Sequence, residues 1–291
     1  MKLDLNTLKA KKSIKELINF GIINIDKPSG PTSFSVSDYV RKSLEINKTS
    51  HTGTLDPMVS GVLPILLGRA CRLSDYFMHR DKTYTGIMRL HSDVSDEKLK
   101  EIISKFIGKI QQLPPVRSRV KREVREREVI SFDILEREGK DVLFETKVQA
   151  GTYIRKICDD MGKEIGGAHM LELRRTEAGI FAEPAHSLYD LDSALELLNK
   201  GDESLFREML IPGEIILNIF PSVNIRPEYL KKCYTGSPLF HEFLESEIKL
   251  PTGDKICARL NNTFIGCYKV VNEGQILAIP EFVFNSLKPE Q

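Results

Sequence analysis

Apolar residues in the first two thirds of the chain follow helical and strand spacings in turn. An i, i+3, i+4, i+8 stripe over 36–44 predicts a helix, and a second stripe predicts another helix over 99–107. Alternation of apolar and polar residues over 142–150 predicts a strand, and a third helical stripe follows over 154–165. This irregular succession of helices and strands predicts a mixed α/β (α+β) domain.

The pattern changes between residues 211 and 221, where helical stripes give way to short apolar runs separated by turns. A length of 291 residues suits two domains better than one. We therefore expect a polar, lysine-rich arm over 1–20, a mixed-sheet domain over 21–215 and a small β-barrel domain over 221–291.

Composition argues against several classes of protein. The five cysteines include no C-x-x-C pair, which argues against a zinc knuckle or a redox-active pair, so no metal site is expected. No run approaches the length of about 18 apolar residues that a membrane-spanning helix requires. We expect a protein of the cytoplasm with no membrane partner.

Positive charge is concentrated in one segment, although the net charge is only +1. Residues 117–127 hold six basic and two acidic side chains. A solvated strand face and a phosphate-contacting strand both fit this segment, and the many arginines favour phosphate contact. The candidates for RNA contact here are Arg117, Arg119, Lys121 and Arg122.

The segment from His51 to Met58 places one carboxylate, that of Asp56, in a turn with a restrained backbone. Gly53 allows backbone angles that other residues resist, while Pro57 fixes its own φ and restricts the residue before it. Such a turn can hold a reactive group still. Most Asp-Pro turns instead lie on the surface with the carboxylate capping a backbone N–H group, so the turn alone leaves both interpretations open.

Five segments, in order along the chain, match the motifs of one enzyme family. They are residues 21–33, 51–68, 82–84, 150–155 and 169–176. With these segments the chain resembles the TruB and dyskerin group of pseudouridine synthases. The resemblance implies the pseudouridine synthase fold and conversion of uridine in RNA to pseudouridine, a reaction that requires no cofactor. The C-terminal part resembles a PUA domain, the small β-barrel that RNA-modifying enzymes often carry, with a generic β-barrel interaction module as the alternative.

The resemblance implies roles for three residues. Asp56 matches the nucleophile, Arg155 the arginine that pairs with it, and Tyr84 the ring that stacks on the target base. The Tyr84 hydroxyl is then the candidate base for the C5 proton. A guanidinium favours the charged form of a partly buried carboxylate, which suits a nucleophile. Outside this context, Arg155 would be interpreted as a surface ion-pair partner and Tyr84 as a core residue.

Further residues match positions around the substrate. His51 matches a histidine beside the flipped nucleotide, Lys27 a lysine that lines the pocket, and Leu173 an apolar residue near the target base. A lone histidine before a turn is more often a capping residue, and a buried leucine needs no such role. Arg174 and Arg175 are expected to contact RNA phosphate or to support the turn, and no catalytic step is assigned to them.

Two kinds of pseudouridine synthase stay open. One acts alone on the TΨC arm of tRNA; the other is the catalytic subunit of archaeal H/ACA ribonucleoproteins, which modify rRNA or tRNA with a guide RNA and small accessory proteins. Short segments after Leu90 and Pro115, where bacterial TruB-like chains carry RNA-gripping insertions, favour the second. An inactive RNA-binding scaffold is a third interpretation, which the presence of Asp56, Tyr84 and Arg155 together disfavours.

Three positions depart from the family's usual residues. Ser50 stands where the family usually has glycine, Phe34 replaces a common histidine, and Glu177-Ala178 replaces the usual Arg-Ser. The last change removes positive charge from an expected RNA face.

Overall fold

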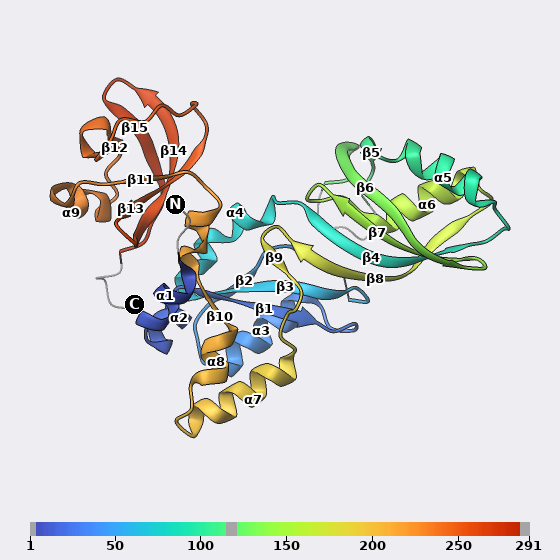
Figure 1. Cartoon of the computed structure of the whole chain (residues 1–291), viewed down its shortest axis with the longest axis horizontal. Coiled ribbons are helices and arrows are strands. Elements are labelled where there is room, and N and C mark those ends of the chain that lie inside the picture. Colours follow the sequence, from blue (N-terminus) through green and yellow to red (C-terminus); the bar gives the residue numbers. More distant parts are fainter. Residues whose placement is uncertain (1–3, 115–120, 286–291) are drawn as a thin grey trace. The chain divides into compact units, whose positions relative to one another are not determined.

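The structure is a computed structural model that describes residues 4–114 and 121–285 (Figure 1). By its internal contacts the chain forms two compact units. Residues 22–209 make up the first, while residues up to Gly21 join those from Leu210 onward in the second. Each unit has its own hydrophobic core.

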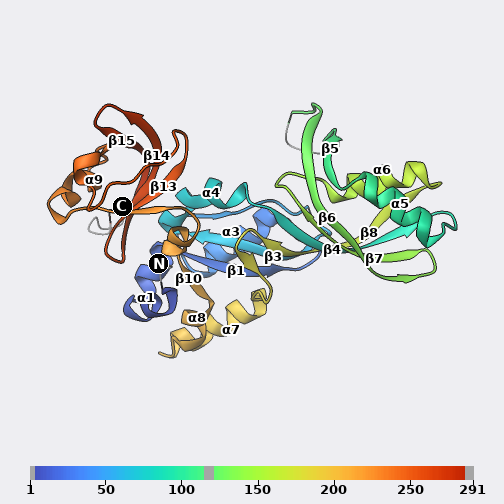
Figure 2. The same cartoon turned by 45° about the horizontal axis from the view of Figure 1, so that its top comes forward.

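Strands of the first unit form one mixed sheet (Figures 1 and 2). They are β1 (Gly21–Lys27), β2 (Thr49–His51), β3 (Ser60–Leu67), β4 (Lys82–Leu90), β5 (Gly108–Gln112), β6 (Arg125–Glu138), β7 (Asp141–Val148), β8 (Ala168–Ala178) and β9 (Phe181–Ala182). Their order is β1-β3-β8-β4-β7-β6-β5, and β2 and β9 pair with β3 and β8 beside it. Neighbours in this order are antiparallel except β3 and β8, which are parallel.

Helices of the first unit are α3 (Ser33–Ser43), α4 (Ser74–Met78), α5 (Asp96–Lys105), α6 (Ile154–Glu164), α7 (Leu188–Asn199) and α8 (Ser204–Met209). Those predicted over 36–44, 99–107 and 154–165 are confirmed as α3, α5 and α6, and the strand predicted over 142–150 is β7. Thr32 caps α3, because its hydroxyl accepts a hydrogen bond from the Ser35 N–H group at 3.0 Å.

One hydrophobic cluster of the first unit lies between α5, α6 and one face of the sheet. Leu99 and Ile102 of α5 and Ile157 and Met161 of α6 belong to one buried cluster with Phe144 of β7. Figure 2 shows α5 and α6 beside the same stretch of sheet. The predicted mixed α/β class is confirmed, and alternate side chains of each strand point to the opposite face.

The second unit contains a separate curled sheet with the order β11-β13-β14-β15-β12 (Figure 1). The strands of this sheet are β11 (Ser222–Asn224), β12 (Leu239–Phe240), β13 (Lys255–Leu260), β14 (Thr263–Glu273) and β15 (Ile276–Val283), and the unit also contains β10 (Leu210–Pro212), which is not part of this sheet. Its helices are α1 (Leu5–Lys11), α2 (Ile14–Asn19) and α9 (Leu230–Tyr234). The small C-terminal β-barrel predicted from short apolar runs is confirmed as a half-barrel.

Residues of the N-terminal arm belong to this second unit. Ser13 caps α2 in a reciprocal arrangement with Glu16. The buried ring of Phe20 stacks on Phe284 at 4.0 Å and on Phe264 at 5.6 Å between ring centroids. The arm is therefore anchored by an aromatic contact to strands near the other end of the chain.

Two findings concern the described residues as a whole. Their helices include none that is long and apolar enough to cross a membrane. Within residues 4–114 and 121–285, no cluster of histidine, cysteine, aspartate or glutamate side chains has the grouping a metal ion needs.

Candidate active site

Residues 52–59 form the loop that joins β2 to β3, two antiparallel neighbours, and this loop carries Asp56. Leu55 and Val59 are each only 3% exposed, so the loop is anchored in the core on both sides of Asp56. Gly53 has a φ of 137°, which favours glycine. The turn predicted from the sequence is therefore a bend fixed by burial as well as by local geometry.

Ser33, at the start of α3, binds the loop from one side. Its buried hydroxyl accepts the Leu55 N–H group at 2.8 Å and donates to the Leu55 carbonyl at 3.3 Å. Nearby, the Gly30 N–H group donates to the Pro57 carbonyl at 2.8 Å, and the Ser29 hydroxyl donates to Met58 at 3.1 Å. These contacts fix the backbone of the residues on each side of Asp56. We call residues 28–34 together with 55–58 the loop wall.

Lys27 lies beneath the loop with its side chain fully buried. Its ammonium group donates to the carbonyls of Pro28, Pro57 and Val59 at 2.8, 2.9 and 2.8 Å. Burial lowers the pKa of Lys27, and the charge of Arg175 lowers this pKa further. Lys27, which was expected to line the pocket, supports the loop through these three carbonyl groups.

Arg175 is also buried, with 1% of its surface exposed. Its guanidinium donates to the carbonyls of Gly53 at 3.1 Å and Val62 at 2.8 Å, and Arg175 lies opposite Tyr84 in the strand register. Burial lowers the pKa of Arg175. The predicted contact of Arg175 with RNA phosphate is wrong, because a buried guanidinium with these partners is not presented to solvent; the alternative, support of the turn, fits.

Asp56 and Arg155 face each other across the site. Arg155 lies in the first turn of α6, and its Nη2 is 3.0 Å from Asp56 Oδ2. The Asp56 and Arg155 side chains are 60% and 55% exposed, so each is covered over less than half of its surface. An ion pair this exposed adds at most about 1 kcal/mol to folding. Both groups are open to an incoming ligand.

Gln112, at the end of β5, sets the start of α6. Its side-chain amide accepts the Tyr153 N–H group at 3.0 Å and donates to the Tyr153 carbonyl at 3.1 Å. Gln112 is buried, so these bonds have little competition from water. These two hydrogen bonds fix Tyr153, the residue directly before the first turn of α6, which carries Arg155.

Tyr84 of β4 is half-buried and packs against the core cluster that includes Leu173. Arg175 and Leu173 of β8 lie opposite Tyr84 and Gly86 in the strand register. A Cβ atom at Gly86 would come within 2.8 Å of the Leu173 side chain. Because Gly86 has no side chain, the Leu173 side chain of β8 fits against β4 next to Tyr84.

His51 is half-buried at the start of the loop, and its Nδ1 accepts the Gly53 N–H group at 3.4 Å. Burial lowers its pKa, and Arg175 lowers it further, so the ring is neutral near pH 7. The unusual Ser50 beside it contacts the Ser74 hydroxyl at 3.4 Å, and Ser74 donates to the His51 carbonyl at 3.3 Å. Ser50 thus connects β2, the strand before the loop, to α4.

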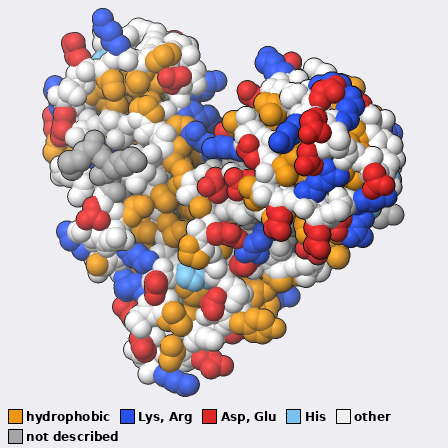
Figure 3. Space-filling view, turned by 45° about the vertical axis from the view of Figure 1, so that its right-hand side comes forward, with side chains coloured by type: hydrophobic (Ala, Val, Ile, Leu, Met, Phe, Trp, Pro, Cys, Tyr) orange, Lys and Arg blue, Asp and Glu red, His pale blue; other side chains and the backbone are white. Residues whose placement is uncertain are grey.

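The other basic candidates lie apart from this cluster. Arg174 pairs with both carboxylate oxygens of Asp26 at 3.0 and 2.8 Å and also with Glu183. Lys121 pairs with Glu123 at 3.0 Å, and Arg122 is exposed. Arg117 and Arg119 lie outside the described residues. Figure 3 shows basic and acidic side chains interspersed on the surface.

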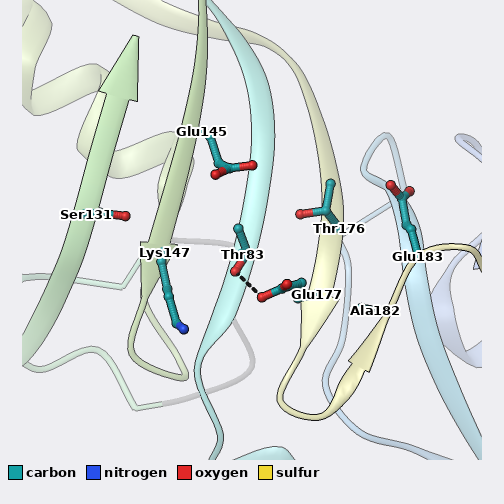
Figure 4. A pocket seen from close by; sticks show the side chains of 8 residues that line it. All are labelled: Thr83, Ser131, Glu145, Lys147, Thr176, Glu177, Ala182 and Glu183. Carbon is teal, nitrogen blue, oxygen red and sulfur yellow. Dashed lines mark hydrogen bonds between the residues drawn. The ribbon is translucent and has the colours of Figure 1, made fainter. Parts of the chain in front are cut away.

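A polar groove of about 430 Å³ lies on the other face of the sheet (Figure 4). It is lined by Thr83, Ser131, Glu145, Lys147, Thr176, Glu177, Ala182 and Glu183. Thr83 and Tyr84 are consecutive on β4, so their side chains point to opposite faces. The Glu177 carboxylate accepts the Thr83 hydroxyl at 2.7 Å. The acidic departure at Glu177 therefore lies away from the face that carries Tyr84.

Comparison with known families accounts for the arrangement around Asp56. The sequence matches the N-terminal domain of TruB family pseudouridylate synthases over residues 41–154 and the C-terminal domain of tRNA pseudouridylate synthase B over 155–218. It also matches the DKCLD (NUC011) domain over residues 10–37. The chain belongs to the TruB family of pseudouridylate synthases. The resemblance inferred from five sequence segments is confirmed.

Relatives in the family include archaeal proteins named "Probable tRNA pseudouridine synthase B". The one from Methanothermobacter thermautotrophicus is 45% identical over 233 residues, which cover 79% of this chain and 72% of the relative. The one from Archaeoglobus fulgidus is 42% identical over 232 residues, covering 79% and 71%.

Solved structures with the same fold are of chains in complexes with other proteins or with RNA. A chain in a Cbf5-Nop10-Gar1 complex has a TM-score of 0.86 and 37% identity, covering 94% of this chain and 88% of that one. A chain in an H/ACA RNP bound to a substrate RNA containing 2′-deoxyuridine has a TM-score of 0.85 and 35% identity, covering 95% and 89%.

The TruB-family site has supporting residues that sequence reasoning missed. Ser33 and Gln112 were assigned no function, although each binds a backbone segment next to Asp56 or Arg155. Lys82 was quoted only as part of a motif. It is 5% exposed and donates to the carbonyls of Met78 and Arg80 at 2.6 and 2.5 Å. The available signal for Lys82 was a lysine next to the apolar residues of a strand, β4.

Lys82 makes folding pH-dependent. Burial lowers its pKa from 10.5 to about 8, with a further contribution from Arg175. Between about pH 8 and 10.5 the unfolded chain holds more protons at this position than the folded chain does. The free energy of unfolding should therefore gain a rising contribution from Lys82 across this range. Urea unfolding at several pH values should show a smaller rise for Lys82→Met than for the wild type.

The exposed Lys100 on α5 provides the control. We expect Lys100→Met to keep the wild-type slope of unfolding free energy against pH. Equal slopes for wild type and Lys82→Met would contradict the burial argument.

Proposed function

We propose that this TruB-family protein isomerises uridine to pseudouridine in rRNA or tRNA as the guide-RNA-dependent catalytic subunit of an H/ACA ribonucleoprotein. The observation that carries the proposal is the exposed Asp56 carboxylate, held on a fixed loop 3.0 Å from the Arg155 guanidinium. The contact between Asp56 and Arg155, with Tyr84 opposite Arg175 on the neighbouring strand, argues against an inactive scaffold.

The reaction breaks the N1–C1′ bond of uridine, turns the base and joins C5 to C1′. C5 loses a proton and N1 gains one, so electrons balance without a redox partner and without a cofactor. In our proposal Asp56 is the nucleophile that holds the intermediate. Arg155 positions the carboxylate by its hydrogen bond to Oδ2. The exposure of both groups leaves room for the nucleotide.

Tyr84 provides the surface on which the target base stacks. Its ring packs against the core cluster, and Arg175 lies opposite it in the strand register. We assign it stacking as the main role, with the hydroxyl as the candidate acceptor of the C5 proton. Leu173, in the same cluster, limits the pocket on the apolar side.

The target uridine must leave its RNA stack before it reaches Asp56. His51 stands at the start of the loop, half-buried and neutral near pH 7, and we propose that its ring helps to hold the flipped nucleotide. A neutral imidazole can stack without attracting the phosphate backbone. Lys27 acts in this proposal through the loop that it supports.

Guide dependence is supported by three observations. The DKCLD match covers residues 10–37, and similar solved chains come from a Cbf5-Nop10-Gar1 complex and from H/ACA complexes. Only residues 91–95 separate β4 from α5, which leaves no room for an RNA-gripping insertion there. We propose guide RNA and small accessory proteins as partners that supply those contacts.

A second candidate function is stand-alone modification of the TΨC arm of tRNA. The observation that favours it is the name of the archaeal relatives, "Probable tRNA pseudouridine synthase B". In either case we propose that residues 21–215 form the catalytic domain and that 221–291 act as a PUA-like RNA-binding domain. A cytoplasmic location is proposed because tRNA and rRNA are the proposed substrates.

Tritium release from C5-labelled uridine distinguishes the two functions. We expect the protein with guide RNA and accessory proteins to release tritium at least tenfold faster than the protein with bare tRNA. Asp56→Asn, the matched control, should abolish release because the amide is a poor nucleophile. Equal release with and without guide RNA would favour the stand-alone function, and release unchanged in Asp56→Asn would refute the mechanism.

Arg155→Ala should separate catalysis from binding. We expect kcat to fall on the order of 100-fold, because a displaced carboxylate loses its attack geometry, while the Kd for RNA changes by less than about threefold. Arg155→Lys keeps the charge but not the planar donor and should recover only part of the rate. Equal losses of kcat and RNA affinity in Arg155→Ala would show that Arg155 serves binding instead.

A further inference from the structure

Two strongly exposed apolar side chains stand on the loop wall around Asp56. Among the large apolar side chains of the described residues, three are more than 70% exposed: Phe34 at 74%, Met58 at 74% and Tyr189 at 84%. Single exposed apolar residues are common on protein surfaces. Here two of the three belong to segments that are bonded to the backbone beside one candidate nucleophile.

Short links fix the positions of these two residues relative to Asp56. Met58 is two residues after Asp56, so their Cα atoms are at most about 7 Å apart. Phe34 directly follows Ser33, whose hydroxyl bonds both backbone groups of Leu55. Because Ser33 is buried and Phe34 is exposed, the phenylalanine ring points out of the wall that Ser33 anchors.

We propose that Phe34 and Met58 form a stacking site for the unpaired nucleotides that flank the target uridine. The inference rests on the proposed function and deepens it. It adds a substrate contact beyond the catalytic groups and gives Phe34, where the family commonly has histidine, a role specific to this chain.

RNA geometry favours a base as the occupant of this site. The flanking nucleotides are covalently joined to the uridine at Asp56, so they must pass the wall. Extrusion of the uridine also deprives them of a stacking neighbour. Aromatic and apolar side chains replace such neighbours, and a nearby guanidinium favours the strand further. Arg155, whose side chain is 55% exposed, supplies that guanidinium on the other side of Asp56.

The test measures RNA affinity and turnover with the assembled guide complex. Phe34→Ala and Met58→Ala should each raise Kd and KM by roughly 5- to 150-fold, the range for loss of one stacked base, with kcat within about twofold. Phe34→Tyr keeps an aromatic ring and should keep wild-type values. Tyr189→Ala removes the most exposed of the three side chains, far along the chain on α7, and should change neither constant.

Abasic substrates identify the contact. Removing the base on one side of the target uridine should weaken wild-type binding by the same factor as Phe34→Ala or Met58→Ala. In the matching alanine variant, removal of the same base should not raise the Kd for RNA any further. This non-additivity is the result that supports stacking.

Other outcomes overturn the stacking site. One such outcome is an unchanged Kd in both alanine variants. Another is a loss of RNA affinity in the variant with abasic RNA that equals the product of the two separate losses. Loss of accessory proteins from Phe34→Ala complexes during size-exclusion chromatography would show that a protein covers this surface instead. Tight RNA binding by the wild type without any tritium release would overturn the proposed function, and the Kd comparison would still decide the stacking site.

Discussion

The candidate active site depends on buried cations that hold a loop through its carbonyl groups. Lys27 donates three hydrogen bonds to backbone carbonyls around Asp56, and Arg175 connects the carbonyls of Gly53 and Val62. Burying such charges is costly, and removing a partner leaves a buried group unsatisfied. The loop therefore has little freedom to change shape without losing several of these bonds at once.

This arrangement separates rigidity from reactivity. The groups that fix the loop are buried, while Asp56 and Arg155, which meet the substrate in our proposal, are more than half exposed. An exposed ion pair contributes little to folding, so its geometry is set from outside, by the loop on one side and by the hydrogen bonds of Gln112 on the other. Both supports are made by the chain's own residues, which lowers the cost of ordering the site.

Local sequence features predicted much of this fold and part of the site. The stripe over 36–44 gave α3 because helical spacing needs no distant information, and Asp56 was placed on a restrained turn by Gly53 and Pro57. The role of Arg175 could not be obtained in this way. Arginine is usually exposed, and its burial follows from the parallel pairing of β8 with β3, a contact between residues more than 100 positions apart. The same holds for Ser33, which looks like a helix cap until its bond to Leu55 is seen.

The most direct test of the loop-anchoring account is the single-turnover rate of tritium release by Arg175→Met and Arg175→Lys, with Arg174→Met as control. Both Arg175 variants are compared at a temperature where circular dichroism shows them folded. We predict a rate loss on the order of 100-fold for Arg175→Met, a smaller loss for Arg175→Lys and an RNA affinity within about threefold of wild type. A folded Arg175→Met variant with the rate of the Arg174→Met control would contradict the account.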